Sequence, residues 1–112
     1  METKHVIVHV YGRDTDDVAS GAHISRRLGE LLPDADVHYV VQGPAVEGLT
    51  VAGTRRLGID TVLDGVQVHA CAHSMKTAGL DPAELRDGVT TVPAAAVYLA
   101  ERQWEGWAYI RI

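Results

Sequence analysis

Apolar positions along this chain follow a strand-like spacing and a helix-like spacing in turn. The first apolar run, Lys4–Tyr11, is rich in β-branched residues and ends at Gly12, which is typical of a strand covered on both faces. Asp14 or Thr15 then caps a predicted helix that continues to Pro33. The apolar stripe of that helix consists of Val18, Ala22, Leu28, Leu31 and Leu32.

The rest of the chain continues this alternation, with one weakly patterned stretch. Glycines interrupt any periodicity between residues 45 and 65, where we expect a loop or short helix and then a helix near Thr54–Leu63. The other predicted strands are Asp36–Gln42, Val66–Ala70, Val89–Val92 and Trp107–Ile112, and the other predicted helices are Ser74–Gly79, Asp81–Leu85 and Ala94–Glu105. Strands that alternate with helices predict a parallel sheet with helices on both faces.

The carboxyl ends of parallel strands form the edge at which such sheets bind ligands. The segments predicted at that edge are Gly12–Asp17, Gly43–Glu47, Cys71–Met75 and Pro93–Ala95. Cys71, the only cysteine, stands between a predicted strand and a helix start, where unpaired N–H groups and the helix dipole lower the pKa of a thiol. It is the candidate nucleophile, against the alternative of a small buried core residue. The predicted rim of a pocket beside it consists of Gly12, Gly43, Ser74 and Met75.

Histidines near Cys71 raise two further interpretations. His73 is close enough in sequence to act on the thiol as a base or hydrogen-bond donor. The spacing His69-x-Cys71-x-His73 also suggests a metal site, but it lacks the paired ligand motifs of structural zinc sites and needs another ligand, such as His9. We therefore expect no metal. His5, His9 and His38, which lie in predicted strands, are interpreted as hydrogen-bonded core or interface residues.

Composition narrows the classes of function. A chain of 112 residues with 46% hydrophobic content predicts a single domain over residues 1–112. The net charge of −5 predicts no nucleic-acid partner, and apolar runs far shorter than ~20 residues predict no membrane partner. No leader pattern opens the chain, and one cysteine fits a reducing compartment, so we expect a cytoplasmic protein. Aromatic residues gathered over Trp104–Tyr109 predict a homo-oligomer.

Three segments resemble one known family. They are Gly65-Val-Gln-Val-His-Ala-Cys71-Ala-His-Ser-Met-Lys-Thr-Ala-Gly79-Leu80, Leu85-x-x-Gly88-Val-x-x-Val-Pro93 and Glu105-Gly-Trp-Ala-Tyr109-Ile. Together they are similar to the signature of the DsrE/DsrF-like family, which includes the YchN-like proteins. The resemblance covers nearly the whole chain and is weakest over residues 45–64.

The resemblance implies a three-layer α/β/α fold with a five-stranded, mainly parallel sheet of flavodoxin-like appearance. It also implies assembly as a trimer or hexamer, and a sulfur carrier without a cofactor that holds sulfane sulfur as a persulfide on Cys71. Sulfur-donor and sulfur-acceptor proteins would then be its partners. Two alternatives remain open: a non-catalytic homo-oligomeric module that binds a small ligand or a partner, with Cys71 only packed, and a redox-sensing thiol that oxidises to sulfenic acid.

Overall fold

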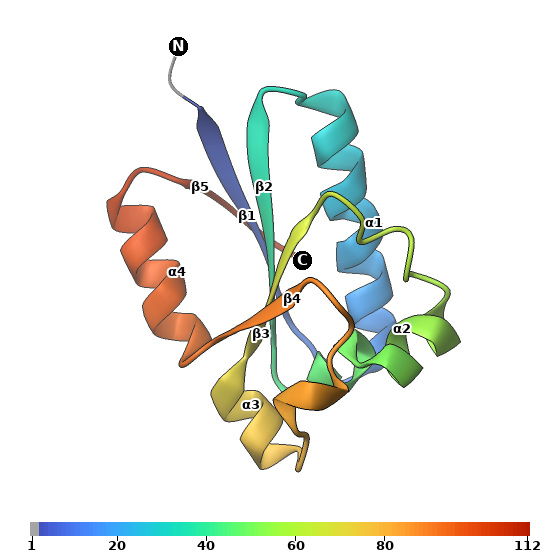
Figure 1. Cartoon of the computed structure of the whole chain (residues 1–112). Helices are drawn as coiled ribbons and strands as arrows, with labels where there is room; N and C mark the ends of the chain where they lie inside the picture. Colours follow the sequence, from blue (N-terminus) through green and yellow to red (C-terminus); the bar gives the residue numbers. More distant parts are fainter. Residues whose placement is uncertain (1–2) are drawn as a thin grey trace.

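The computed structural model describes residues 3–112 and contains one five-stranded parallel sheet (Figure 1). The strands are β1 (Lys4–Tyr11), β2 (Ala35–Gln42), β3 (Gln67–Cys71), β4 (Val89–Val92) and β5 (Ala108–Arg111). The helices are α1 (Thr15–Leu31), α2 (Val51–Leu57), α3 (Ala72–Thr77) and α4 (Ala95–Trp104), with short 3₁₀ helices η1 (Pro44–Leu49) and η2 (Pro82–Glu84). The predicted α/β fold with a five-stranded parallel sheet is confirmed.

The strand order, β4-β3-β2-β1-β5, determines which face each helix covers. From β1 to β4 each strand is added on the same side of the one before it, so right-handed crossovers bring α1 and α2 to one face. The return from β4 to the opposite edge at β5 brings α4 to the other face (Figure 1). One helix of 10 residues therefore covers the second face. Within residues 3–112, no helix has the length and apolarity needed to cross a membrane.

The larger core lies between α1 and the first three strands, and it is centred on a buried tyrosine. Tyr39 of β2 is fully buried, and its hydroxyl donates a hydrogen bond of 2.7 Å to the carbonyl of Val18 in α1. Burial also raises the pKa of Tyr39. A Cβ atom on Gly21 of α1 would lie 2.6 Å from two carbons of the tyrosine ring. The close approach of α1 to the sheet therefore depends on a glycine at this position.

Local capping explains most of the element boundaries. The Asp14 side chain accepts a hydrogen bond from the backbone N–H of Asp16 at the start of α1, as the sequence predicts. The helix predicted near Thr54–Leu63 instead spans Val51–Leu57. The Thr50 hydroxyl caps its start, and Gly58, with a φ of 66°, ends it in the left-handed conformation. Gly58, one of the glycines that interrupt the apolar periodicity of the sequence, is thus the residue that ends α2.

The substitution Gly21→Ala tests the contact between α1 and β2. We expect it to lower the free energy of unfolding by about 1–3 kcal/mol, because the added methyl group overlaps the Tyr39 ring. Gly29→Ala is the matched control in the same helix, since nothing lies within 4 Å of its added Cβ. That control should gain about 0.5–1 kcal/mol from helix propensity. Urea denaturation of both variants measures the difference, and an equal response would contradict the proposed contact.

Candidate functional site

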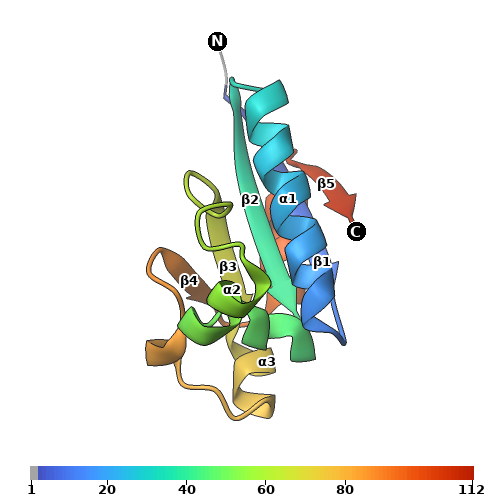
Figure 2. The same ribbon diagram turned by 90° about the vertical axis from the view of Figure 1, so that its right-hand side faces the viewer.

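Three strands end side by side at the edge of the sheet where α3 begins (Figures 1 and 2). Tyr11, the last residue of β1, is paired with Gln42, the last residue of β2. The register of β2 and β3 pairs Val41 with Ala70, so the following residues, Gln42 and Cys71, are neighbours at this edge. Parallel pairing thus places Tyr11, Gln42 and Cys71 in one row.

Cys71 is the last residue of β3 and the residue that precedes the first turn of α3. Its side chain is buried, with 2% of its surface exposed. The small apolar cluster around it, between the sheet and α4, consists of Ile7, Val40, Ala95 and Leu99. The only cysteine is therefore held in a packed environment on the second face of the sheet.

Burial and hydrogen-bond donors act on the Cys71 thiol in opposite directions. Burial raises its pKa, but the Ser74 hydroxyl and the backbone N–H groups of Ala95, Ser74 and His73 favour the thiolate. The donors outweigh burial, so the pKa of Cys71 is lowered. The donors come from the first turns of two helices, α3 and α4, which β3 and β4 place beside each other.

The orientation of Ser74 depends on the loop after β2. The backbone N–H of Gly43 donates a hydrogen bond of 2.8 Å to Ser74 Oγ. The hydroxyl proton of Ser74 is thus left free to be donated, and this hydroxyl lowers the pKa of Cys71. Gly43 has a φ of 85°, and a Cβ there would lie 2.9 Å from the carbonyl oxygen of Gly12. That same carbonyl accepts a 3.0 Å hydrogen bond from Ala45. Gly12 therefore supports the loop that positions Ser74.

A cleft of about 550 Å³ opens beside Ser74 at this edge. It is lined by Tyr11, Gln42, Gly43, Pro44, His73, Ser74, Thr77 and Ala78. Of the residues named from the sequence, Gly43, His73 and Ser74 line the cleft. Met75 instead packs in the larger core, and the His73 side chain is exposed in the cleft while its backbone N–H faces Cys71. Ser74 is the residue that contacts both the cleft and the environment of the thiol.

A partly buried chain of hydrogen bonds links the cleft residue Gln42 to β1 and β5. His9 is 5% exposed, with its Nδ1 2.7 Å from Tyr109 Oη and its Nε2 3.0 Å from Gln42 Oε1. Burial lowers the pKa of His9, so we assign a neutral imidazole whose Nε2–H donates to Gln42 and whose Nδ1 accepts from Tyr109. Sequence reasoning did not link these three residues, because 100 positions separate His9 from Tyr109.

The spacing His69-x-Cys71-x-His73 does not produce a shared metal site. His69 Nδ1 and Nε2 contact Thr90 and His38, whereas His73 lies in the cleft. Within the described part of the chain, no three His, Cys, Asp or Glu side chains are grouped so that they could hold a metal ion.

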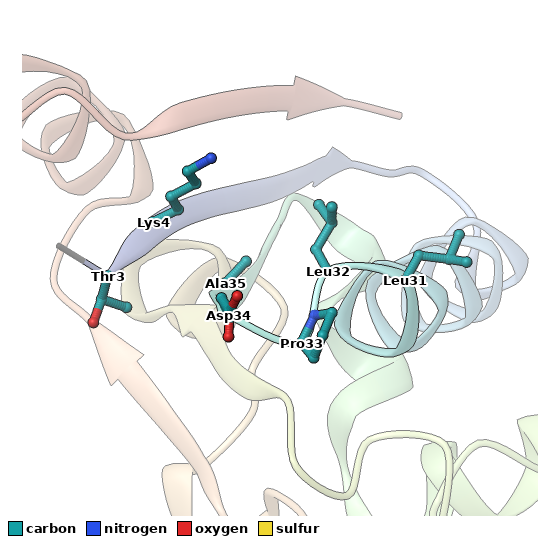
Figure 3. A pocket seen from close by; sticks show the side chains of 7 residues that line it. All are labelled: Thr3, Lys4, Leu31, Leu32, Pro33, Asp34 and Ala35. Atoms are coloured by element: carbon teal, nitrogen blue, oxygen red, sulfur yellow. The ribbon is translucent and has the colours of Figure 1, made fainter. Parts of the chain in front are cut away.

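A second cavity lies at the opposite edge of the sheet, at the amino ends of β1 and β2 (Figure 3). Its volume is about 390 Å³, and its lining consists of Thr3, Lys4, Leu31, Leu32, Pro33, Asp34 and Ala35. The lining holds no cysteine or histidine, and Leu31 is 62% exposed. This cavity therefore lacks the thiol and imidazole groups of the carboxyl edge.

The pH dependence of Cys71 alkylation tests the donors around the thiol. We expect iodoacetamide to label the native protein with a midpoint below the ordinary thiol pKa of about 8.5. Ser74→Ala should raise that midpoint by about one unit, because one hydrogen bond to the thiolate is lost. Thr77→Ala, which changes another cleft residue whose hydroxyl binds the His73 carbonyl, should leave it unchanged. Labelling that follows unfolding, with an ordinary midpoint, would contradict the prediction.

Comparisons with known proteins identify the fold. No protein-family model matches the chain, and no curated protein does. The structure is similar to that of MTH1491 from Methanobacterium thermoautotrophicum, a protein of unknown function, with a TM-score of 0.82 and 26% identity over 97% of this chain and 99% of that one. For YchN from E. coli the TM-score is 0.70, with 21% identity over 99% of this chain and 100% of that one.

A third similar structure is that of BT1422 from Bacteroides thetaiotaomicron, described as a conserved protein of unknown function. Its TM-score is 0.68, with 16% identity over 97% of this chain and 95% of that one. All three likenesses extend over the whole sheet and its helices, because nearly the full length of both chains is matched each time. This chain therefore has the fold of YchN and of these two structures.

Proposed function

We propose that this chain is a DsrE/DsrF-like sulfur carrier that holds sulfane sulfur as a persulfide on Cys71. The observation that carries the proposal is the set of donors around the thiol, which lowers the pKa of Cys71 although the side chain is buried. The fold shared with YchN and the sequence resemblance around Cys71 support it. A thiolate is the nucleophile in sulfur exchange, so an environment that favours the thiolate is the first requirement of a carrier.

The transfer step balances without a cofactor. The Cys71 thiolate attacks the outer sulfur of a donor persulfide, R–S–SH; the donor's S–S bond breaks, and the donor leaves as the thiolate R–S⁻. Cys71 then carries the transferred S–H group. The Ser74 hydroxyl and the N–H of Ala95, which favour the Cys71 thiolate, are placed to stabilise negative charge beside the new S–S bond. An acceptor thiolate removes the outer sulfur by the same exchange in reverse.

Burial of Cys71 defines how a donor would reach it. Ser74 lines the cleft whereas Cys71 does not, and the hydroxyl of Ser74 accepts a hydrogen bond from the N–H of Gly43. A donor that enters the cleft must displace Ser74 before it meets the sulfur. Since α3 has only 6 residues, its first turn can shift without disturbing a long helix. The proposed partners are a sulfur-donor protein and a sulfur-acceptor protein that present their thiols at this edge.

Persulfide loading tests the proposal directly. After incubation of the native protein with sodium polysulfide, intact mass spectrometry should show the addition of one sulfur atom, which dithiothreitol removes. Cys71→Ser should take up none, Ser74→Ala should load more slowly, and Thr77→Ala should load like the wild type. Equal uptake by wild type and Cys71→Ser would refute the carrier function.

The low exposure of Cys71 favours one alternative function. With 2% of its surface exposed, the thiol could serve only in packing, and the cleft would then belong to a non-catalytic module that binds a small ligand or a partner. A native protein that takes up no sulfur, while Cys71→Ala lowers the free energy of unfolding, supports this alternative. Conversion of Cys71 to sulfenic acid by peroxide, without sulfur uptake, would instead support a redox-sensing thiol.

We also propose that the chain forms a homo-oligomer through the outer face of α4. Val97 is 58% exposed and Trp104 is 82% exposed, and positions seven apart lie on the same face of a helix. The neighbouring edge strand β5 exposes Tyr109 and Ile110 as well. An indole exposed to this extent is typical of a residue that a protein partner covers.

Sedimentation of the wild type and two surface variants tests the oligomer. We expect the wild type to sediment as a trimer or hexamer at micromolar concentration, and Trp104→Glu to shift it toward the monomer because a charge would be buried in the interface. Leu31→Lys, at an exposed apolar residue on the opposite edge, is the control and should leave the assembly unchanged. A monomeric wild type would contradict the proposal.

A further inference from the structure

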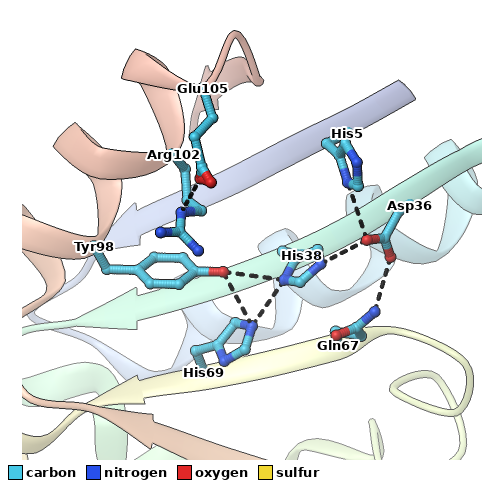
Figure 4. A network of polar contacts seen from close by, with 8 residues as sticks. All are labelled: His5, Asp36, His38, Gln67, His69, Tyr98, Arg102 and Glu105. Carbon is cyan, nitrogen blue, oxygen red and sulfur yellow. Dashed lines mark hydrogen bonds and ion pairs between the residues drawn. The ribbon is translucent and has the colours of Figure 1, made fainter. Parts of the chain in front are cut away.

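Three potential metal-ligand atoms converge on the second face of the sheet, beneath α4 (Figure 4). His38 Nδ1 of β2 lies 2.9 Å from His69 Nε2 of β3. Tyr98 Oη of α4 lies 3.1 Å from His38 Nδ1 and 3.5 Å from His69 Nε2. Two neighbouring strands and the covering helix each contribute one atom to this triangle. Neither Cys71 nor the residues that line the cleft belong to it.

The dimensions of this triangle fit a tetrahedral metal ion. Zinc binds imidazole nitrogen at about 2.0–2.1 Å, so two ligands of an ideal tetrahedron lie about 3.3–3.4 Å apart. The three observed separations are 2.9, 3.1 and 3.5 Å, and a point about 2 Å from all three atoms lies about 0.9 Å above their plane. We propose that His38, His69 and Tyr98 bind a divalent transition-metal ion of the zinc type, with the fourth position open to solvent.

The outer hydrogen bonds of the two histidines match those of metal ligands. His38 Nε2 lies 2.9 Å from Asp36 Oδ2, a carboxylate that receives its N–H, and His69 Nδ1 lies 2.7 Å from Thr90 Oγ1. Metal-bound histidines generally have the second ring nitrogen held by such a partner, which orients the ring and raises its basicity. Asp36 is itself held by Gln67 and by His5, at 2.8 Å and 3.1 Å. Each imidazole therefore has one nitrogen held from outside and the other directed to the triangle.

Proton and charge balance also suit a cation at this position. The single N–H shared between His38 Nδ1 and His69 Nε2 would move to His69 Nδ1 when a metal ion binds, where it donates to Thr90 Oγ1, and both imidazoles stay neutral. The Tyr98 hydroxyl loses its proton to solvent on binding, and the Arg102 guanidinium, 5.1 Å from the centre of the Tyr98 ring, lies beside the phenolate that forms.

The site is within reach of solvent and does not depend on the proposed sulfur chemistry. His69 and Tyr98 are half-buried, and Thr90 on edge strand β4 is exposed, so an ion can enter beside β4. The third ligand is a tyrosine hydroxyl. The site is therefore not one of the groups of three His, Cys, Asp or Glu side chains that the described residues lack. The metal site and the persulfide site can therefore fail or succeed separately.

Metal titration of the untagged, chelator-stripped chain tests the site. We expect isothermal calorimetry to give one Zn²⁺ per chain with proton release, and Co²⁺ to develop visible absorption bands of a tetrahedral site. His69→Gln should abolish this binding, Asp36→Asn should weaken it about 10–100-fold, and Tyr98→Phe should weaken it and change the Co²⁺ spectrum. His23→Gln and His73→Gln, at exposed histidines outside the network, should bind like the wild type.

Three results would overturn the proposal of a metal site. It is wrong if the wild type binds no Zn²⁺ at micromolar concentration, if His69→Gln binds as well as the wild type, or if either control variant removes the binding. Circular dichroism and urea denaturation establish that the variants are folded. If His69→Gln fails to fold, Tyr98→Phe decides, because it removes only the hydroxyl, and an unchanged affinity and Co²⁺ spectrum would then exclude the triangle as the site.

Discussion

The parallel pairing of β1, β2 and β3 is the constraint on which the rest of the molecule depends. Its register places Tyr11 opposite Gln42 and Val41 opposite Ala70, so that three strands end at one edge. The loop after β2 can then reach α3, where Gly43 binds Ser74. The same register places His38 and His69 close enough to share a proton. A slip of one residue in any of these strands would move the side chains of that strand to the other face.

Helices cover the two faces of the sheet to different extents, and this difference explains why polar side chains gather on one face. The face under α1 and α2 is a continuous apolar core, with Tyr39 as its largest fully buried side chain. The face under α4 combines a small apolar cluster around Cys71 with histidines on three strands. One helix cannot cover five strands with apolar contacts alone, so the polar side chains on this face satisfy their hydrogen bonds with one another. The histidine network is the result.

Two opposing effects act on the pKa of the Cys71 thiol, and the position of the residue between β3 and α3 decides which is larger. Burial alone would make Cys71 an inert core residue, since a charge is costly away from water. Donors from two helix starts reverse that tendency, and they meet at the sulfur because β3 and β4 are neighbours. Reactivity and packing are therefore separate properties of this residue. The donors favour the thiolate, while the surrounding side chains leave 2% of the Cys71 surface exposed.

The sequence by itself determined the order of the elements and the position of Cys71 between a strand and a helix, because spacing and capping are local properties. It was misleading over residues 45–65, where the helix predicted near Thr54–Leu63 instead begins after Thr50 and ends at Gly58. Only the tertiary structure decided that Met75 turns into the core, that His73 enters the cleft, and that His9 binds Tyr109. Those contacts depend on strand order and register, which bring together side chains that no local pattern relates.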